Sequence, residues 1–240
     1  MKQGFTLIEM TMVLLIVGLL VGSFVIPLGA QMDINNIKAT DQRLAQIKEA
    51  LLGYAARNRR LPCPDTDTVL PKVRDGKENR KPDNSCDEEG NISGQRFKEG
   101  DLPWADLGVD GKDAWGNYFR YRVDSAHSAL TAYSVTILES TKGDPKDNLE
   151  VLNKQNISLS SERVSFNPPP PQVSRVVAIF FSDGKNKQPN ALNIPSILLD
   201  PDSKVYTQDD FVPNDFDDRL VWLSDNELVS RLTAAGFRIK

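Results

Sequence analysis

The sequence GFTLIEMTMVLLIVGLLVGSFVIPLGA, residues 4–30, carries one ionisable side chain, Glu9. Its apolar part from Phe5 to Ile26 would form a helix about 33 Å long at 1.5 Å per residue. The hydrocarbon core of a bilayer is about 30 Å thick. The sequence therefore predicts a transmembrane helix segment over residues 5–30.

Glu9 is the unusual residue of this segment, because a charge at the centre of a bilayer costs about 3 kcal/mol and a charge near the boundary costs less. If the chain were cut between Gly4 and Phe5, the new amine of Phe5 would lie on the same helix face as Glu9, four residues away. That amine could neutralise Glu9 within one chain. The amine of a neighbouring chain could do so instead, and would align two helices side by side.

Residues 4–9, Gly-Phe-Thr-Leu-Ile-Glu, together with the apolar run that follows, closely resemble the processing signal of the type IV pilin family, which includes the pseudopilins of type II secretion. The resemblance implies that a membrane prepilin peptidase removes a leader peptide, residues 1–4, by cutting after Gly4, and methylates the amine of Phe5. It also implies that Glu9 pairs with the N-terminal amine of an adjacent subunit during assembly.

Two simpler interpretations of the first thirty residues stay open. One is a secretory signal cleaved before Gln31, although its apolar core is longer than the usual 7–15 residues. The other is an ordinary membrane anchor that keeps Met1. Both the pilin-like interpretation and the plain anchor place the chain in a membrane. Lys2, on the short N-terminal side of the apolar segment, then favours a single-pass protein with a cytoplasmic N-terminus.

The chain stays helical beyond the apolar segment. Residues 31–60 predict an amphipathic continuation of the helix, because apolar residues recur at spacings of three, four and seven. This stripe contains Ile37, Leu44, Ile47, Leu51 and Ala55. Leu61-Pro62 should stop the helix, since a residue before proline avoids helical geometry. Pro27 removes a backbone donor and should kink the helix, and if that kink is mild, Phe5 to Asn58 form one long helix.

Residues 61–240 predict a globular domain. Strand patterns occur at 118–123, 132–138, 174–182 and 219–223, and four prolines at 168–171 form a stiff connector. Ser224 to Glu227 is a capping-box pattern that should open a helix ending near Gly236. The expected fold class is α+β: a long N-terminal helix, membrane-spanning in its first half, packed on a mainly antiparallel sheet, in a pilin-like arrangement.

Residues 62–117 form a loop-rich region that holds the chain's two cysteines, Cys63 and Cys86. An exported domain meets an oxidising compartment, so we predict a disulfide that closes this region, with two free thiols as the alternative. Residues 113–117, Asp-Ala-Trp-Gly-Asn, resemble the turn that precedes the sheet of pseudopilins. This second similarity extends the resemblance to about residue 123.

Catalytic and ligand-binding patterns are weak, and we predict no catalytic residue, no cofactor and no metal. The single histidine, His127, lies in no triad-like pattern. Asn91 and Asn156 begin glycosylation patterns, which we interpret as ordinary surface loops. Two groups of loop acids offer oxygen ligands of the kind calcium accepts: Asp65, Asp67 and Asp75, and Asp106, Asp110 and Asp113. Neither group matches the twelve-residue calcium loop, so we interpret these acids as turn-forming and solubilising.

Taken with the resemblance, these features predict a structural subunit and not an enzyme. The expected protein is a minor pilin or pseudopilin of a type IV pilus-like filament or a type II secretion pseudopilus. A soluble part of about 180 residues favours a minor subunit. Its partners would be other pilin-like subunits, prepilin peptidase, an inner-membrane assembly platform and membrane lipid. The net charge of −4 argues against nucleic acid as a partner.

The predicted location is the bacterial inner membrane, with the C-terminal domain in the periplasm, or a cell-surface filament after assembly. The alternative function is a membrane-anchored periplasmic enzyme or binding protein whose N-terminus is a plain anchor.

Overall fold

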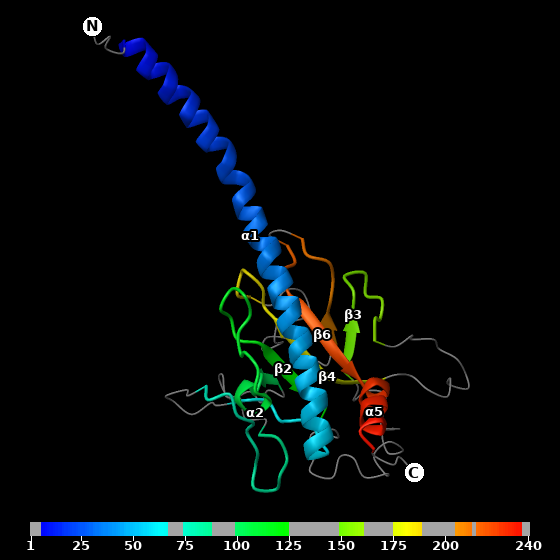
Figure 1. The fold of residues 1–240 in the computed structure, drawn as a ribbon. Coiled ribbons are helices and arrows are strands. Elements are labelled where there is room, and N and C mark those ends of the chain that lie inside the picture. The colour runs from blue at the N-terminus through cyan, green and yellow to red at the C-terminus, as the bar shows by residue number, and fades with distance from the viewer. Residues whose placement is uncertain are drawn as a thin grey trace, which may run out of the picture. The chain divides into compact units, whose positions relative to one another are not determined.

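The computed structural model describes residues 6–66, 74–87, 99–124, 149–160, 175–188, 205–212 and 215–236, without the side chains of 22–28 and 30. The chain divides into two compact units, Met1–Ala39 and Thr40–Lys240. The helix α1, Leu7–Asn58, contributes residues to both units (Figure 1). Each unit is considered by itself below.

Helix α1 is 52 residues long and ends at Asn58, where the sequence predicted its end. Arg59 follows in the left-handed conformation (φ 58°), and its N–H donates to the carbonyl of Ala55 (2.9 Å). Left-handed geometry just past the last turn is a common way to end a helix, and Pro62 follows three residues later. Within the described part of the chain, no helix is both long enough and apolar enough over one stretch to cross a bilayer.

The second half of α1 belongs to unit Thr40–Lys240 and supplies one side of its core. The predicted apolar stripe is confirmed here for Leu44, Ile47, Leu51 and Ala55, which are completely buried. Its first member, Ile37, belongs to the other unit and is half-buried. Ion pairs surround this packing on the helix's polar flanks. They join Asp41 to Arg219, Lys48 to Glu227 and Glu49 to Arg231.

A four-stranded antiparallel sheet in the order β1-β2-β4-β6 lies against α1 and confirms the predicted α+β class (Figure 1). Its strands are β1 (Glu99–Asp101), β2 (Arg120–Val123), β4 (Val176–Ser182) and β6 (Arg219–Ser224). Three of the predicted strands are therefore confirmed, with somewhat different bounds. The predicted strand 132–138 and the proline connector 168–171 lie outside the described residues.

Both faces of the sheet are covered, which explains why all seven residues of β4 are buried. On one face, Ala178 and Phe180 join the core cluster of α1. On the other face, Ile179 and Phe181 join a second cluster with Val151 and its neighbours. The pairing of β4 with β6 shifts between Val176 and Ala178, and such a bulge places two consecutive residues on one side.

The second cluster is completed by β3 (Glu150–Leu152) and β5 (Val205–Thr207), which pair in parallel. This pair is an exception to the expected antiparallel pairing, and neither strand was predicted from the sequence. Strand β1 and the short helix α2 (Trp104–Leu107), within the region expected to be irregular, were not predicted either. Elements of three or four residues are too short to show a hydrophobic period.

The last described element, α5 (Asp225–Ala234), confirms the predicted C-terminal helix. Ser224 is its N-cap, and its hydroxyl accepts a hydrogen bond from the N–H of Glu227 (3.3 Å). Leu228 and Leu232 are buried in the same cluster as α1. Gly236 lies just past the helix at φ 90°, a conformation that favours glycine.

Candidate functional site

Glu9 lies in the first turn of α1 and forms a capping box with Thr6. Glu9 Oε2 accepts hydrogen bonds from the backbone N–H of Thr6 (2.9 Å) and from its hydroxyl (2.8 Å). In return, Thr6 Oγ1 accepts a hydrogen bond from the N–H of Glu9 (3.4 Å). This reciprocal arrangement satisfies two donors at the start of a helix. The pattern Thr-x-x-Glu is visible in the sequence, although the predicted partner of Glu9 was an amine and not Thr6.

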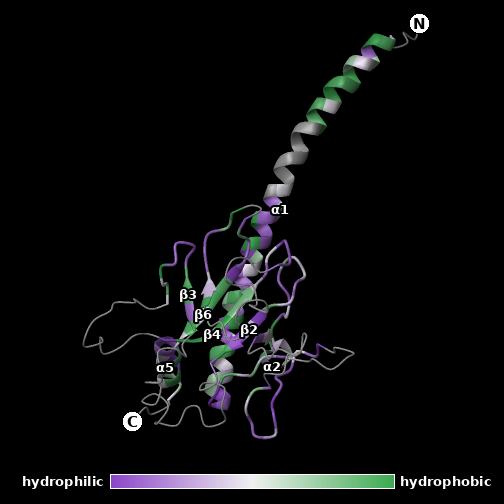
Figure 2. Ribbon diagram, turned by 180° about the vertical axis from the view of Figure 1, so that it is seen from behind, coloured by the Kyte–Doolittle hydropathy of each residue, from purple (hydrophilic) through white to green (hydrophobic). Residues whose placement is uncertain are grey.

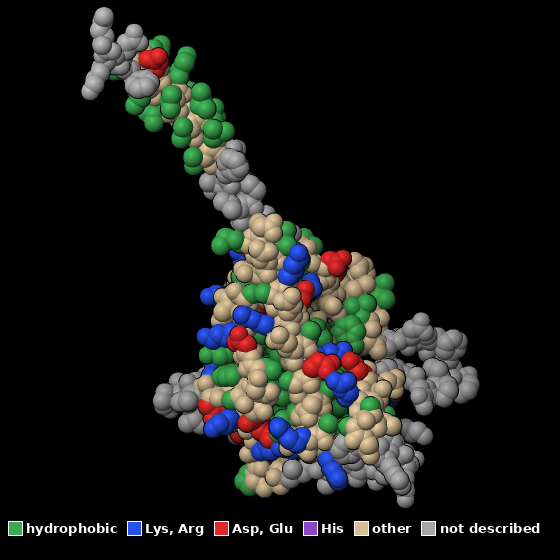
Figure 3. All heavy atoms as spheres, viewed as in Figure 1, with side chains coloured by type: hydrophobic (Ala, Val, Ile, Leu, Met, Phe, Trp, Pro, Cys, Tyr) green, Lys and Arg blue, Asp and Glu red, His purple; other side chains and the backbone are tan. Residues whose placement is uncertain are grey.

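The helix surface around Glu9 is apolar and exposed (Figures 2 and 3). Leu7 is 85% exposed and Ile8 is 65% exposed. The large apolar side chains from Met10 to Val21 are exposed too, and consecutive ones point to every side of the helix. A helix that is apolar on every side is typical of a segment surrounded by lipid or by other helices. Gly4 and Phe5, the predicted processing residues, lie outside the described residues.

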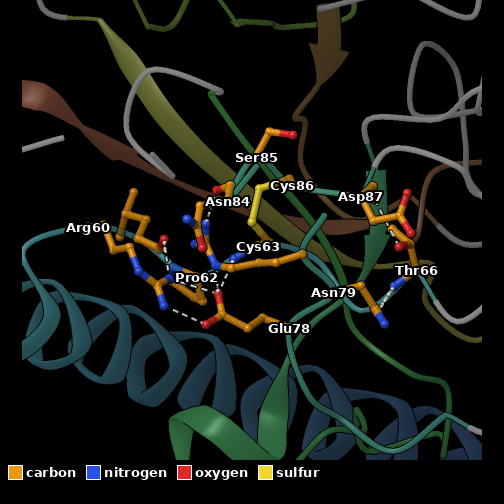
Figure 4. The surroundings of a disulfide bond; sticks show 12 residues. Arg60, Pro62, Cys63, Thr66, Glu78, Asn79, Asn84, Ser85, Cys86 and Asp87 are labelled. Atoms are coloured by element: carbon orange, nitrogen blue, oxygen red, sulfur yellow. Dashed lines mark hydrogen bonds and ion pairs between the residues drawn. A yellow bond between two sulfur atoms is a disulfide. The ribbon is translucent and has the colours of Figure 1, made fainter. Parts of the chain in front are cut away.

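A second site lies at the far end of α1, where Cys63 and Cys86 form a disulfide, as predicted (Figure 4). The bond closes a loop across a sequence separation of 23 residues, with 5.3 Å between the two Cα atoms. Closing a loop of this size is worth about 3 kcal/mol in the chain-entropy model. Cys63 is completely buried, whereas Cys86 is partly buried.

Glu78, which the sequence analysis did not single out, receives most of the hydrogen bonds near the disulfide. Its carboxylate accepts from both terminal nitrogens of Arg60 (2.6 and 2.8 Å), Nε of Arg80 (2.9 Å), the hydroxyl of Tyr54 (3.0 Å) and the N–H of Cys63 (3.0 Å). Burial opposes ionisation of Glu78, but the hydrogen bonds from Arg60 and Cys63 and the charges of Arg80 and Arg60 prevail. They lower its pKa to about 2.

The same environment acts on Tyr54 in the opposite sense. Burial and the neighbouring negative charge of Glu78 raise the pKa of Tyr54 to about 12. The hydroxyl therefore remains a hydrogen-bond donor to Glu78 at any physiological pH. The last turns of α1 and the residues just past its end are thereby joined to the disulfide loop by one neutral side chain, Tyr54 in the helix, and one charged side chain, Arg60 beyond it.

The loop acids considered as calcium ligands act as acceptors for nearby backbone N–H groups. Asp65 accepts from Gly76 (2.9 Å), and Asp106 accepts from Glu78 (2.7 Å). Asp75 and Asp110 each accept from the residue two positions later. In the described ranges, no three acidic, histidine or cysteine side chains gather as a metal site. Asp67 and His127 lie outside these ranges.

Residues 113–117 form the predicted tight turn before β2, with Gly116 at φ 87°. The carboxylate of Asp113 accepts hydrogen bonds from the N–H groups of Trp115 (2.9 Å) and Asn117 (2.8 Å). It also accepts from the hydroxyl of Ser182 at the end of β4 (2.5 Å). This turn therefore connects to the turn that follows β4 at residues 184–187, where the carbonyl of Gly184 also accepts a hydrogen bond from the side-chain amide of Asn117 (2.6 Å).

A buried group of charges on β1, on β2 and just past the end of β4 was also not predicted from the sequence. Arg120 forms an ion pair with Glu99, and its other terminal nitrogen lies 4.0 Å from Asp183 Oδ1. The hydroxyl of Tyr206 donates to Glu99 (2.6 Å). Burial raises the pKa of Asp183 to about 6. The positive charge of Arg120 lowers this pKa, whereas the negative charges of three nearby acids raise it further: Glu99, Asp113 and Asp101. The group brings together residues that are distant in sequence, which no local pattern reveals.

Asp183→Asn is expected to stabilise the protein at pH 8 by about 2 kcal/mol and to have little effect at pH 4. The pKa of Asp183 in the folded chain is about 6, above its ordinary value of 3.8. The folded state is therefore penalised above pH 6, and the penalty disappears as the pH falls through 6 toward 4. Urea unfolding at both pH values measures the effect. A loss of stability at pH 8 would show that the pairing of Asp183 with Arg120 outweighs the cost of burial.

Comparisons with known proteins give no match: neither a family model, nor a curated protein, nor a solved structure is similar to this chain.

Proposed function

We propose that this chain is a structural subunit, a minor pilin or pseudopilin, of a type IV pilus-like filament or a type II secretion pseudopilus. On this proposal, a prepilin peptidase cuts after Gly4 and methylates the amine of Phe5. The first part of α1 holds the chain in the inner membrane until assembly. The unit Thr40–Lys240 then lies in the periplasm or on the filament surface.

The observation that carries the proposal is an ionisable residue on a helix surface that is otherwise apolar on every side. Residues 7–21 expose large apolar side chains around the whole helix, with Glu9 as the one charged residue among them. Exposing such a large apolar surface to water is unfavourable, so lipid or other helices are expected to cover it. Once it is covered, the carboxylate needs a counterion, and the freed amine of a neighbouring chain supplies one.

The capping box adds a role for Thr6 in this proposal. Both of its hydrogen bonds reach Oε2 of Glu9. They hold the side chain against the first turn, at the end of the helix where the cut would occur. In a side-by-side pair of helices, the N-terminal amine of the neighbouring chain would lie near this end of the helix. A carboxylate held here is therefore close to that amine along the helix axis.

The proposal is tested by expressing the full chain in membranes together with a prepilin peptidase and comparing it with Gly4→Val. The wild-type chain is expected to lose residues 1–4, and Gly4→Val is expected to keep them, because a branched side chain replaces the small residue before the cut. Mass spectrometry of the purified chains distinguishes the two. Gly18→Val is the matched control, since nothing lies within 4 Å of a Cβ added at Gly18.

Retention of residues 1–4 by the wild-type chain in the presence of an active peptidase would contradict the proposal. The alternative, a membrane-anchored enzyme or binding protein, would gain support from specific small-molecule binding that is insensitive to processing.

A further inference from the structure

The loop closed by Cys63 and Cys86 is also closed by hydrogen bonds that involve no sulfur atom (Figure 4). Residues 78–80, the central segment, lie between the two cysteine-bearing segments. On the Cys63 side, Glu78 accepts from the N–H of Cys63 (3.0 Å). Asn79 donates from its N–H to the carbonyl of Pro64 (3.2 Å) and accepts at Oδ1 from the N–H of Thr66 (2.6 Å).

The central segment makes a matching set of contacts on the Cys86 side. The guanidinium of Arg80 donates to the carbonyl of Asn84 (2.7 Å). Asn79 accepts at its carbonyl from the N–H of Asp87 (3.0 Å), and Arg80 pairs with Cys86 as an isolated antiparallel bridge. The three residues 78–80 therefore hold both cysteine-bearing segments through the backbone as well as through side chains.

A direct link between the two cysteine-bearing segments supplements the central segment. The hydroxyl of Thr66, three residues after Cys63, donates to the carbonyl of Asp87, the residue after Cys86 (2.9 Å). The two segments are therefore joined without residues 78–80. Glu78 then attaches the whole arrangement to α1 through Tyr54, and to the segment just past the helix through Arg60. The side chains of Arg60, Arg80 and Glu78 are 11%, 14% and 16% exposed, so water competes weakly for these bonds.

We propose that Glu78 and the central segment close this loop before oxidation and hold the two thiols side by side in the reduced chain. The disulfide then fastens a loop that is already formed. Glu78 is a positioning residue in this scheme, because it acts through the backbone of Cys63 and through Arg80, and it takes no part in the exchange of sulfur bonds.

The oxidation itself needs a small disulfide from outside the chain. One cysteine thiolate attacks this oxidant, forms a mixed disulfide and releases one thiol. The second cysteine then displaces the other thiol and forms the Cys63–Cys86 bond. Two electrons and two protons leave the protein and convert one disulfide into two thiols. Closing the loop and forming the disulfide are linked equilibria. A contact that favours the closed loop over the open loop by some factor in the reduced chain therefore raises the effective concentration of the two thiols by that factor.

The experiment measures this effective concentration in the full chain, purified in a mild detergent and equilibrated with reduced and oxidised glutathione at pH 7.5. Alkylation of the remaining thiols followed by intact mass analysis gives the oxidised fraction. The wild-type chain is expected to exceed, by tenfold or more, the millimolar value typical of a flexible loop. Glu78→Gln is expected to lower the effective concentration at least tenfold, and Tyr54→Phe, which removes one hydrogen bond, at least threefold.

Ile179→Val is the matched control, because Ile179 lies in the second core cluster and Cys86 packs against the first. It should lower the stability of the protein and leave the effective concentration within twofold of wild type. A wild-type value in the millimolar range would overturn the proposal, and so would values for Glu78→Gln and Tyr54→Phe within twofold of wild type. If Glu78→Gln does not fold, Tyr54→Phe decides the question alone.

Discussion

Glu9→Ala is expected to reduce incorporation of the chain into a filament at least tenfold while leaving removal of the leader largely intact. In the assembled state, the amine of the neighbouring chain would lose its counterion among apolar helices. Leaving a buried charge unpaired costs more than 1.4 kcal/mol, which corresponds to a factor of ten in the equilibrium. Crosslinking between subunits, quantified against total processed chain, measures incorporation.

Glu9→Gln separates the charge of Glu9 from its role in the capping box. A glutamine at this position can still accept the hydrogen bonds of Thr6, so the helix start is preserved. If the charge is what matters, Glu9→Gln should fail as badly as Glu9→Ala. Incorporation restored by glutamine would assign Glu9 to helix capping alone. Glu49→Ala, an exposed acid further along the same helix, should assemble normally.

Glu78→Gln is expected to destabilise the protein, lowering the free energy of unfolding by about 2 kcal/mol at pH 7. Removing one partner of a buried ion pair typically costs about 3–5 kcal/mol, and partial exposure of Glu78 to solvent reduces this figure. Urea unfolding of the full chain in detergent, followed by tryptophan fluorescence, measures it. The three tryptophans, Trp104, Trp115 and Trp222, all lie in the unit Thr40–Lys240.

The pH dependence provides a second measurement on the same variant. The pKa of Glu78 falls from 4.5 to about 2 on folding, so its contribution is fully present above pH 4.5 and is lost as the pH falls toward 2. The wild-type chain should therefore lose more stability than Glu78→Gln over this range. Glu49→Gln, which breaks an exposed pair with Arg231, should change stability by less than about 0.5 kcal/mol. If Glu78→Gln and Glu49→Gln changed the free energy of unfolding equally at pH 7, Glu78 would stabilise the protein no more than an exposed ion pair does.

The features that the sequence predicted correctly are those that depend on neighbours along the chain. The end of α1 follows from the apolar stripe and from Pro62, and the N-cap of α5 follows from Ser224 and Glu227. Strand β4 was predicted because an apolar run of seven residues suits a strand covered on both faces. The disulfide was predictable because a chain with two cysteines has only one way to pair them within itself.

The features that the sequence did not predict depend on residues brought together by folding. Glu78 meets Tyr54 and Arg60 because the disulfide loop folds back on the end of α1, and no spacing in the sequence encodes that return. The ion pair of Arg120 with Glu99 requires the register of β1 with β2. Strand β1 itself contains only Glu, Gly and Asp, residues with low strand propensity, and its pairing with β2 prevails over that preference.

Intact mass and N-terminal sequencing of the protein from its native host would decide between an assembly subunit and a plain anchored protein. We expect a chain that begins at a methylated Phe5 and lacks residues 1–4. A chain that still begins at Met1, or one that begins at Gln31, would contradict assembly through Glu9 and the amine of a neighbouring subunit.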